Sequence, residues 1–177
     1  MTHLVLIGLM GAGKTTVGRR CAEALGRGFV DTDDAIAANA GMTVPEIFST
    51  EGEAGFRSRE RAVVADVVAS PDPLVVACGG GAMVDAENRR AVRAHGYVVW
   101  LAGAPDELAA RVEADGTASR PLLAGGPTVA TLTRLGDARA DAYAAAAHTR
   151  IDTDGRDVET VTAAVLAAFQ DARAGEA

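Results

Sequence analysis

One segment near the start of the chain restricts the fold more than any other. Residues 8–15 read Gly-Leu-Met-Gly-Ala-Gly-Lys-Thr, which matches the phosphate-binding pattern G-x-x-x-x-G-K-[ST]. The apolar run 4–7 precedes it, and helix-forming residues follow over 14–25, until Gly26. A buried strand, a glycine loop and a helix in this order are typical of a P-loop. The alternative is a plain glycine turn that carries an incidental lysine.

The lysine of this segment points to nucleotide chemistry. Lys14 is the only lysine among the chain's 17 basic residues, and it stands where a compact ammonium group is needed between phosphates. In a P-loop, Lys14 would reach the β- and γ-phosphates and Thr15 would ligate Mg²⁺. We therefore expect ATP and Mg²⁺ as ligands. The residues expected to bind the nucleotide in this loop are Gly11, Ala12, Gly13, Lys14, Thr15 and Thr16.

Strand-like and helix-like segments alternate along the whole chain. Strands separated by helices imply an α/β fold with a parallel sheet covered on both faces, in which ligands bind at the carboxyl ends of the strands. Besides the strand before the P-loop, the expected strands are 29–31, 74–77, 97–101 and one that ends at 150–151. Helical segments are expected over 33–68, where Thr43 and Glu46 form a capping box that opens one of them, and over 158–172.

Composition excludes several classes of function. The 177 residues suit a single domain, residues 1–177, with or without a lid. The net charge of −7 argues against nucleic acid as a partner. The apolar runs are shorter than the roughly 18 residues of a membrane span, and Cys21 and Cys78 show neither metal-site nor disulfide spacing. We expect a cytoplasmic protein, and a monomer because nothing in the sequence suggests an interface.

Three acidic residues follow the second expected strand. In an extended segment Asp31 and Asp33 would point to one side and Asp34 to the other. Two carboxylates facing the P-loop would suit a ligand to a metal-bound water and a group that receives the acceptor's hydroxyl proton. Alternatively, these acids only favour the start of the next helix, which is the interpretation we prefer for Asp34.

Further along, Arg57 and Glu60 lie three residues apart on one expected helix face. They are either a surface ion pair or a guanidinium oriented by a carboxylate to bind an anion; spacing alone does not decide. The Gly79-Gly80-Gly81 run after a strand either lets the backbone approach a ligand closely or forms a plain turn.

The segment from about 113 to 127 is rich in glycine and carries Arg120 at its centre. It is either an ordinary mobile loop or a lid that closes Arg120 on the phosphates. By spacing alone Arg139 and Arg156 would be solvated charges.

Taken together, these segments resemble the shikimate kinases. The resemblance covers residues 4 to about 170, and it rests on several segments in the right order. They are the P-loop at 8–15, Asp-Thr-Asp at 31–33, Gly-Glu-x-x-Phe-Arg-x-x-Glu at 52–60, Gly-Gly-Gly at 79–81, Arg-Pro-Leu-Leu at 120–123, and Arg139 with Tyr143.

This resemblance implies a fold and an activity. The fold would be a five-stranded parallel sheet in the order 2-3-1-4-5 with a lid, and 33–68 would form a substrate-binding helical segment. The activity would be transfer of the ATP γ-phosphate to the 3-hydroxyl of shikimate, a step towards chorismate and the aromatic amino acids.

The resemblance also implies roles for individual residues. Lys14 and Arg120 would act in catalysis, and Arg120 and Arg156 would contact the nucleotide. Asp33 would receive the acceptor hydroxyl, and Thr15 would hold Mg²⁺, with Asp31 bound to it through water. The residues implied to bind shikimate are Asp33, Arg57, Gly80, Gly81 and Arg139.

Two alternatives stay open at this stage. Another small-molecule kinase of the same fold, such as a gluconate kinase, would use a different acceptor pattern. A nucleotide-dependent switch protein would bind ATP without an acceptor, although the presence of Asp33 argues against it.

Overall fold

The computed structural model describes residues 3–114 and 129–175. The strands in this part of the chain form a five-stranded parallel sheet in the order β2-β3-β1-β4-β5, which confirms the expected topology. The strands are β1 (His3–Ile7), β2 (Gly28–Asp31), β3 (Leu74–Ala77), β4 (Gly96–Ala102) and β5 (Thr149–Asp152).

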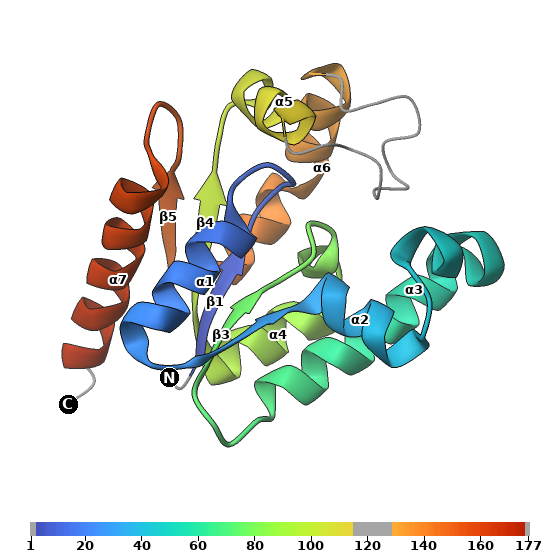
Figure 1. The fold of residues 1–177 in the computed structure, drawn as a ribbon, viewed down its shortest axis with the longest axis horizontal. Coiled ribbons are helices and arrows are strands. Elements are labelled where there is room, and N and C mark those ends of the chain that lie inside the picture. The colour runs from blue at the N-terminus through green and yellow to red at the C-terminus, as the bar shows by residue number, and fades with distance from the viewer. Residues whose placement is uncertain (1–2, 115–128, 176–177) are drawn as a thin grey trace.

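Helices cover both faces of this sheet (Figure 1). The α1 and α7 helices pack against each other on one side, while α4 contacts β4, α3 and α6 on the other. The helical elements are α1 (Lys14–Leu25), α2 (Thr32–Ala40), α3 (Val44–Val68), the 3₁₀ turn η1 (Ala82–Val84), α4 (Ala86–His95), α5 (Pro105–Ala114), α6 (Val129–Ala146) and α7 (Val158–Ala174).

The central strand β1 is buried along its whole length, as its continuous apolar sequence predicts. His3 begins it and is only 1% exposed. Its Nδ1 accepts a hydrogen bond from the N–H of Leu74, and its Nε2 lies 3.1 Å from the carbonyl oxygen of Val68. Both bonds require a neutral imidazole, and burial lowers the pKa of His3 accordingly.

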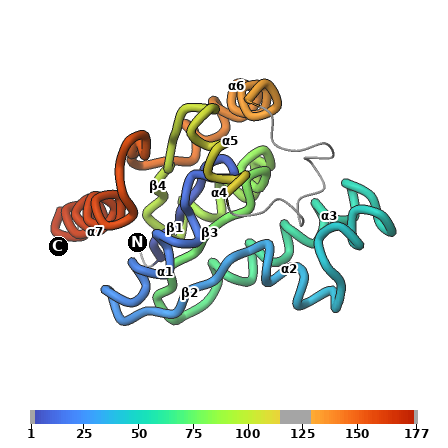
Figure 2. Tube along the Cα trace, turned by 45° about the horizontal axis from the view of Figure 1, so that its top comes forward, coloured from blue at the N-terminus to red at the C-terminus, as the bar shows by residue number. Residues whose placement is uncertain are grey.

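Two helices, α2 and α3, stand at the opposite end of the molecule from α7 (Figure 2). Thr43 and Glu46 form the expected capping box at the start of α3. Gly52 interrupts α3 with φ 70° and ψ −175°, values that glycine tolerates best. The helical segments expected over 33–68 are therefore two helices, the second of them broken at Gly52.

No helix within residues 3–114 and 129–175 combines the length and the apolar character needed to cross a membrane.

Candidate active site

The P-loop joins the end of β1 to the start of α1 as the motif predicts. Gly11 and Gly13 adopt left-handed backbone angles, φ 78° and 84°, and a Cβ on Gly11 would lie 2.6 Å from the carbonyl oxygen of Leu108. Glycine is therefore required at Gly11 for both conformation and space. The Lys14 ammonium donates to the Leu9 carbonyl at 2.9 Å, so its charge lies over the loop. A loop of this shape at a helix N-terminus suits a phosphate.

Beside the loop, a hydrogen bond between a hydroxyl and a carboxylate connects α1 to the end of β2. The Thr15 hydroxyl donates to Asp31 Oδ2 at 2.8 Å. The other oxygen of this carboxylate, Oδ1, accepts the N–H of Asp33 at 3.1 Å and thereby caps α2. Hard oxygen donors next to a phosphate site fit Mg²⁺, which binds through few protein ligands and keeps several waters.

Asp33 reaches the cleft by a different route from the one that we expected. The chain is not extended at this point, because α2 already begins at Thr32. The Thr32 hydroxyl instead accepts the N–H of Gly79 at 2.9 Å and attaches the start of α2 to the end of β3. A Cβ on Gly79 would overlap Asp33 Oδ1. The argument from strand alternation was therefore wrong, and the exposed Asp34 also lines the cleft.

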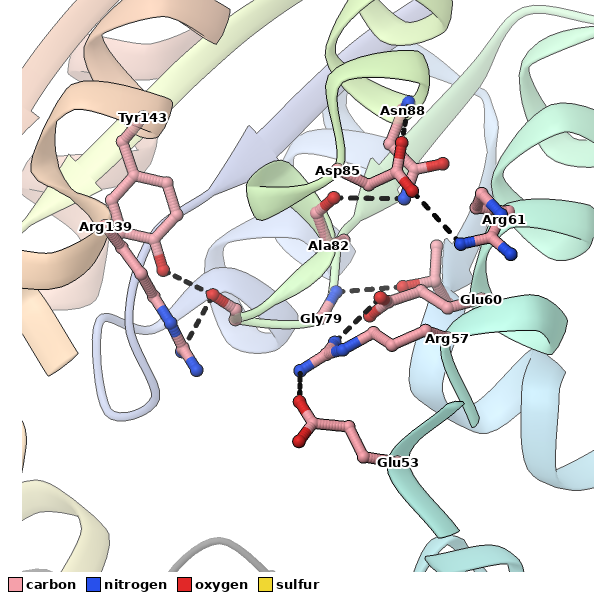
Figure 3. Close-up of polar contacts among 12 residues, drawn as sticks. Glu53, Arg57, Glu60, Arg61, Gly79, Ala82, Asp85, Asn88, Arg139 and Tyr143 are labelled. Carbon is pink, nitrogen blue, oxygen red and sulfur yellow. Dashed lines mark hydrogen bonds and ion pairs between the residues drawn. The ribbon is translucent and has the colours of Figure 1, made fainter. Parts of the chain in front are cut away.

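Arg57 and Glu60 form a partly buried pair rather than a surface pair (Figure 3). Arg57 donates to Glu60 at 2.8 Å and to Glu53 at 3.4 Å, and Glu60 is 1% exposed. Burial raises the pKa of Glu60, and Arg57 offsets this only in part. Burial opposes the charge on Arg57, but the Glu60 carboxylate raises the pKa of Arg57. The guanidinium is thus held charged and oriented at the cleft.

Arg139 and Tyr143 of α6 face Arg57 across the glycine run (Figure 3). Arg139 is only 7% exposed, so the interpretation from spacing alone, a solvated charge, is wrong. It donates to the Gly80 carbonyl oxygen at 3.0 Å, and the Tyr143 hydroxyl donates to the same oxygen at 2.5 Å. The Gly79-Gly80-Gly81 run therefore passes between the guanidinium groups of Arg57 and Arg139.

One cleft of about 1010 Å³ connects the P-loop, Asp31, Asp33 and the guanidinium groups of Arg57 and Arg139, and its volume is that of a substantial ligand site. Although the chain as a whole is acidic, basic and acidic side chains line this cleft in similar number. The candidate residues that line it are Gly11, Ala12, Gly13, Lys14, Thr15, Thr16, Asp31, Asp33, Arg57, Gly80, Gly81, Arg139 and the exposed Arg156. Arg120 and the proposed lid beyond residue 114 lie outside the described residues.

The structure adds cleft residues that the sequence analysis did not select. Arg111 of α5 lies in the lining, where it donates to the Thr153 hydroxyl at 2.9 Å and to Glu107 at 2.9 Å. Its i, i+4 spacing from Glu107 resembles an ordinary surface pair, so the sequence held no signal for it. Phe48 and Phe56, stacked 4.6 Å apart, belong to the lining formed by α3.

Comparisons with known proteins agree with this geometry. The shikimate kinase family model matches residues 10–170. A shikimate kinase of Symbiobacterium thermophilum is 49% identical over 96% of this chain and 97% of its own length. One of Thiobacillus denitrificans is 43% identical over 90% of this chain and 86% of its own. The structure of Acinetobacter baumannii shikimate kinase in complex with shikimate matches with a TM-score of 0.90 and 36% identity, covering 97% of this chain and 94% of that one.

Proposed function

Because this chain belongs to the shikimate kinase family, we propose that it transfers the γ-phosphate of ATP to the 3-hydroxyl of shikimate in the cleft between the P-loop and α3. The observation that carries this proposal is the meeting of three groups at one cleft. They are the phosphate-binding loop, the Asp33 carboxylate, and two guanidinium groups on either side of the glycine run.

The nucleotide occupies the P-loop end of this cleft. Lys14 binds the β- and γ-phosphates and stabilises the charge that develops during transfer. Thr15 would hold Mg²⁺ directly and Asp31 would hold it through water, and the bound ion would neutralise phosphate charge. Thr16 and the loop glycines contribute the remaining phosphate contacts. Arg156 contacts the adenine side, and Arg120, which lies outside the described residues, is assigned to the phosphates.

The acceptor occupies the other end, between α3 and α6. Asp33 receives the proton of the 3-hydroxyl, or positions that hydroxyl for a loose transition state. Arg57 and Arg139 bind the shikimate carboxylate, for which two guanidinium groups in a partly closed site provide the compensating charge. Gly80 and Gly81 offer backbone contacts to the ring substituents.

The same proposal includes the protein's setting. We infer a cytoplasmic monomer, formed as a single domain over residues 1–177, that does not bind nucleic acid. The acidic net charge of −7 supports the last point.

An acceptor panel tests the proposed function. ADP release is measured with shikimate, quinate, gluconate and no acceptor, each with Mg²⁺ and with a chelator. We expect turnover that depends on both shikimate and Mg²⁺. Stimulation by gluconate in place of shikimate would contradict the substrate, and ADP release that no acceptor stimulates would contradict a kinase acting on these molecules.

A further inference from the structure

The carbonyl of Gly80 is held by two side chains of one helix. Tyr143 and Arg139 both donate to this oxygen, at 2.5 Å and 3.0 Å (Figure 3). They are one turn apart on α6, while Gly80 follows β3. Since the proposed function assigns Arg139 to the acceptor but gives Tyr143 no part, the second donor calls for an explanation.

Tyr143 is rigid and remains a donor. Its side chain is 2% exposed, and its ring packs against Trp100 of β4 with centroids 5.5 Å apart. Burial raises the pKa of Tyr143 to about 12, and the positive charge of Arg139 only partly opposes this. The phenol is therefore protonated at any ordinary working pH, and its proton points to the carbonyl oxygen, which can only accept.

Three consecutive glycines need such external bonds. Glycine has the greatest backbone freedom of all residues, and this run has no side chains of its own to fix it. Its first N–H, from Gly79, is held by Thr32 at 2.9 Å, and its second carbonyl, from Gly80, is held by the two donors of α6. The described part of the chain contains no cis peptide bond, so fixing the Gly80 carbonyl also fixes the opposite direction of the Gly81 N–H.

We infer that Tyr143 is a positioning residue for the acceptor: its hydroxyl holds the Gly80–Gly81 peptide in the binding orientation when Arg139 turns to the acceptor's carboxylate. This inference rests on the proposed function. Without Tyr143, the rigid guanidinium of Arg139 would have to hold the carbonyl and bind the carboxylate in one orientation. With Tyr143 on the carbonyl, Arg139 can turn to the carboxylate while the peptide stays in place. Gly81 would then stay aligned beside the Arg57 guanidinium, which a Cβ on Gly81 would approach within 2.6 Å.

The test is Tyr143→Phe, which keeps the ring and its packing and removes only the hydroxyl. We expect KM for shikimate to rise roughly 3- to 10-fold, the usual effect of one lost neutral hydrogen bond, while KM for ATP stays within about 1.5-fold. The affinity for shikimate, measured by calorimetric titration into the nucleotide-free protein, should fall by the same factor. An unchanged KM for shikimate, or equal changes in both KM values, would overturn the inference.

Tyr97→Phe is the matched control. The chain has two tyrosines, and the Tyr97 hydroxyl also makes a 2.5 Å hydrogen bond, to Thr149 Oγ1 between β4 and β5, but it does not line the cleft. We expect both KM values of this variant to match the unaltered protein. If Tyr97→Phe raises KM for shikimate as Tyr143→Phe does, loss of any buried hydroxyl explains the effect and the inference fails. Absence of shikimate-dependent turnover in the unaltered protein would instead contradict the proposed function.

A second measurement does not depend on how well Tyr143→Phe folds. Fluorotyrosine incorporated at both tyrosines gives two ¹⁹F signals, and the Tyr97→Phe protein identifies the one from Tyr143. Adding shikimate should shift the Tyr143 signal and leave that of Tyr97 in place. A Tyr143 signal that does not respond to saturating shikimate would contradict the inference.

Discussion

Gly81→Ala should separate acceptor binding from folding. The backbone of Gly81, at φ −99° and ψ −11°, is one that alanine adopts without strain. The added Cβ, however, would lie 2.6 Å and 2.7 Å from the two terminal nitrogens of Arg57. The Arg57 side chain is 22% exposed, so its guanidinium can shift away from the added Cβ, and therefore away from the acceptor's carboxylate, while it keeps Glu60 as a partner and costs the fold little. The substitution therefore acts on Arg57 and not on the backbone.

The size of the effect follows from what Arg57 does. Losing one member of a desolvated charge pair costs about 2–5 kcal/mol, and each 1.4 kcal/mol is a factor of about ten. We expect kcat/KM for shikimate to fall by at least about 30-fold in Gly81→Ala. The midpoint of thermal unfolding should stay within a few degrees, because replacing a glycine of permitted geometry removes unfolded-state entropy.

Gly80→Ala is the comparison for this experiment. A Cβ there would meet Arg139 and the Gly8 carbonyl only at 3.5 Å, an ordinary contact. Its loss in kcat/KM should therefore be several-fold smaller than that of Gly81→Ala in the same coupled ADP-release assay. Equal losses in the two variants, or a Gly81→Ala protein as active as the unaltered one, would refute the reasoning about Arg57.

Three other predictions concern separate parts of the molecule. Lys14→Arg should lose most of its kcat although the charge is kept, because a planar fork does not replace a point charge between two phosphates; activity within a few-fold of the original would contradict this. Asp33→Asn should lower kcat by roughly 100-fold, while Asp34→Asn, at an exposed position, should change it by only a few-fold; equal effects would contradict the separate roles. The free energy of unfolding should fall as pH drops below about 6.5, with a slope of at most about 1.4 kcal/mol per pH unit, because the pKa of His3 is lowered by burial and the unfolded chain takes up its proton first. His3→Gln should remove this part of the pH dependence, and an unchanged profile in urea titrations would contradict it.

The parts of this structure that sequence could predict are those carried by local patterns. The apolar run of β1, the P-loop glycines and the Thr43–Glu46 capping box are each set by residues a few positions apart, and each was found as expected. The strand order came from family resemblance rather than from any local pattern, and it too was confirmed.

The parts that sequence could not predict depend on contacts between distant segments. Arg139 is held by a backbone carbonyl 59 residues away. Because every residue has a backbone carbonyl, the sequence does not reveal this contact. Asp33 was placed correctly in the cleft for the wrong reason, since α2 starts one residue earlier than strand alternation assumed. Whether Arg57 and Glu60 form a surface pair or an oriented pair depends on burial, which their spacing does not encode.

The central claim is that the γ-phosphate moves to the 3-hydroxyl of shikimate, and the product tests it most directly. The protein is incubated with ATP, Mg²⁺ and shikimate, and the phosphorylated product is examined by ³¹P–¹H correlation spectroscopy. The account predicts a single phosphate monoester whose phosphorus couples to the proton on carbon 3, formed in step with ADP and absent without the protein. A phosphate on another hydroxyl, or ADP accompanied only by inorganic phosphate, would contradict it.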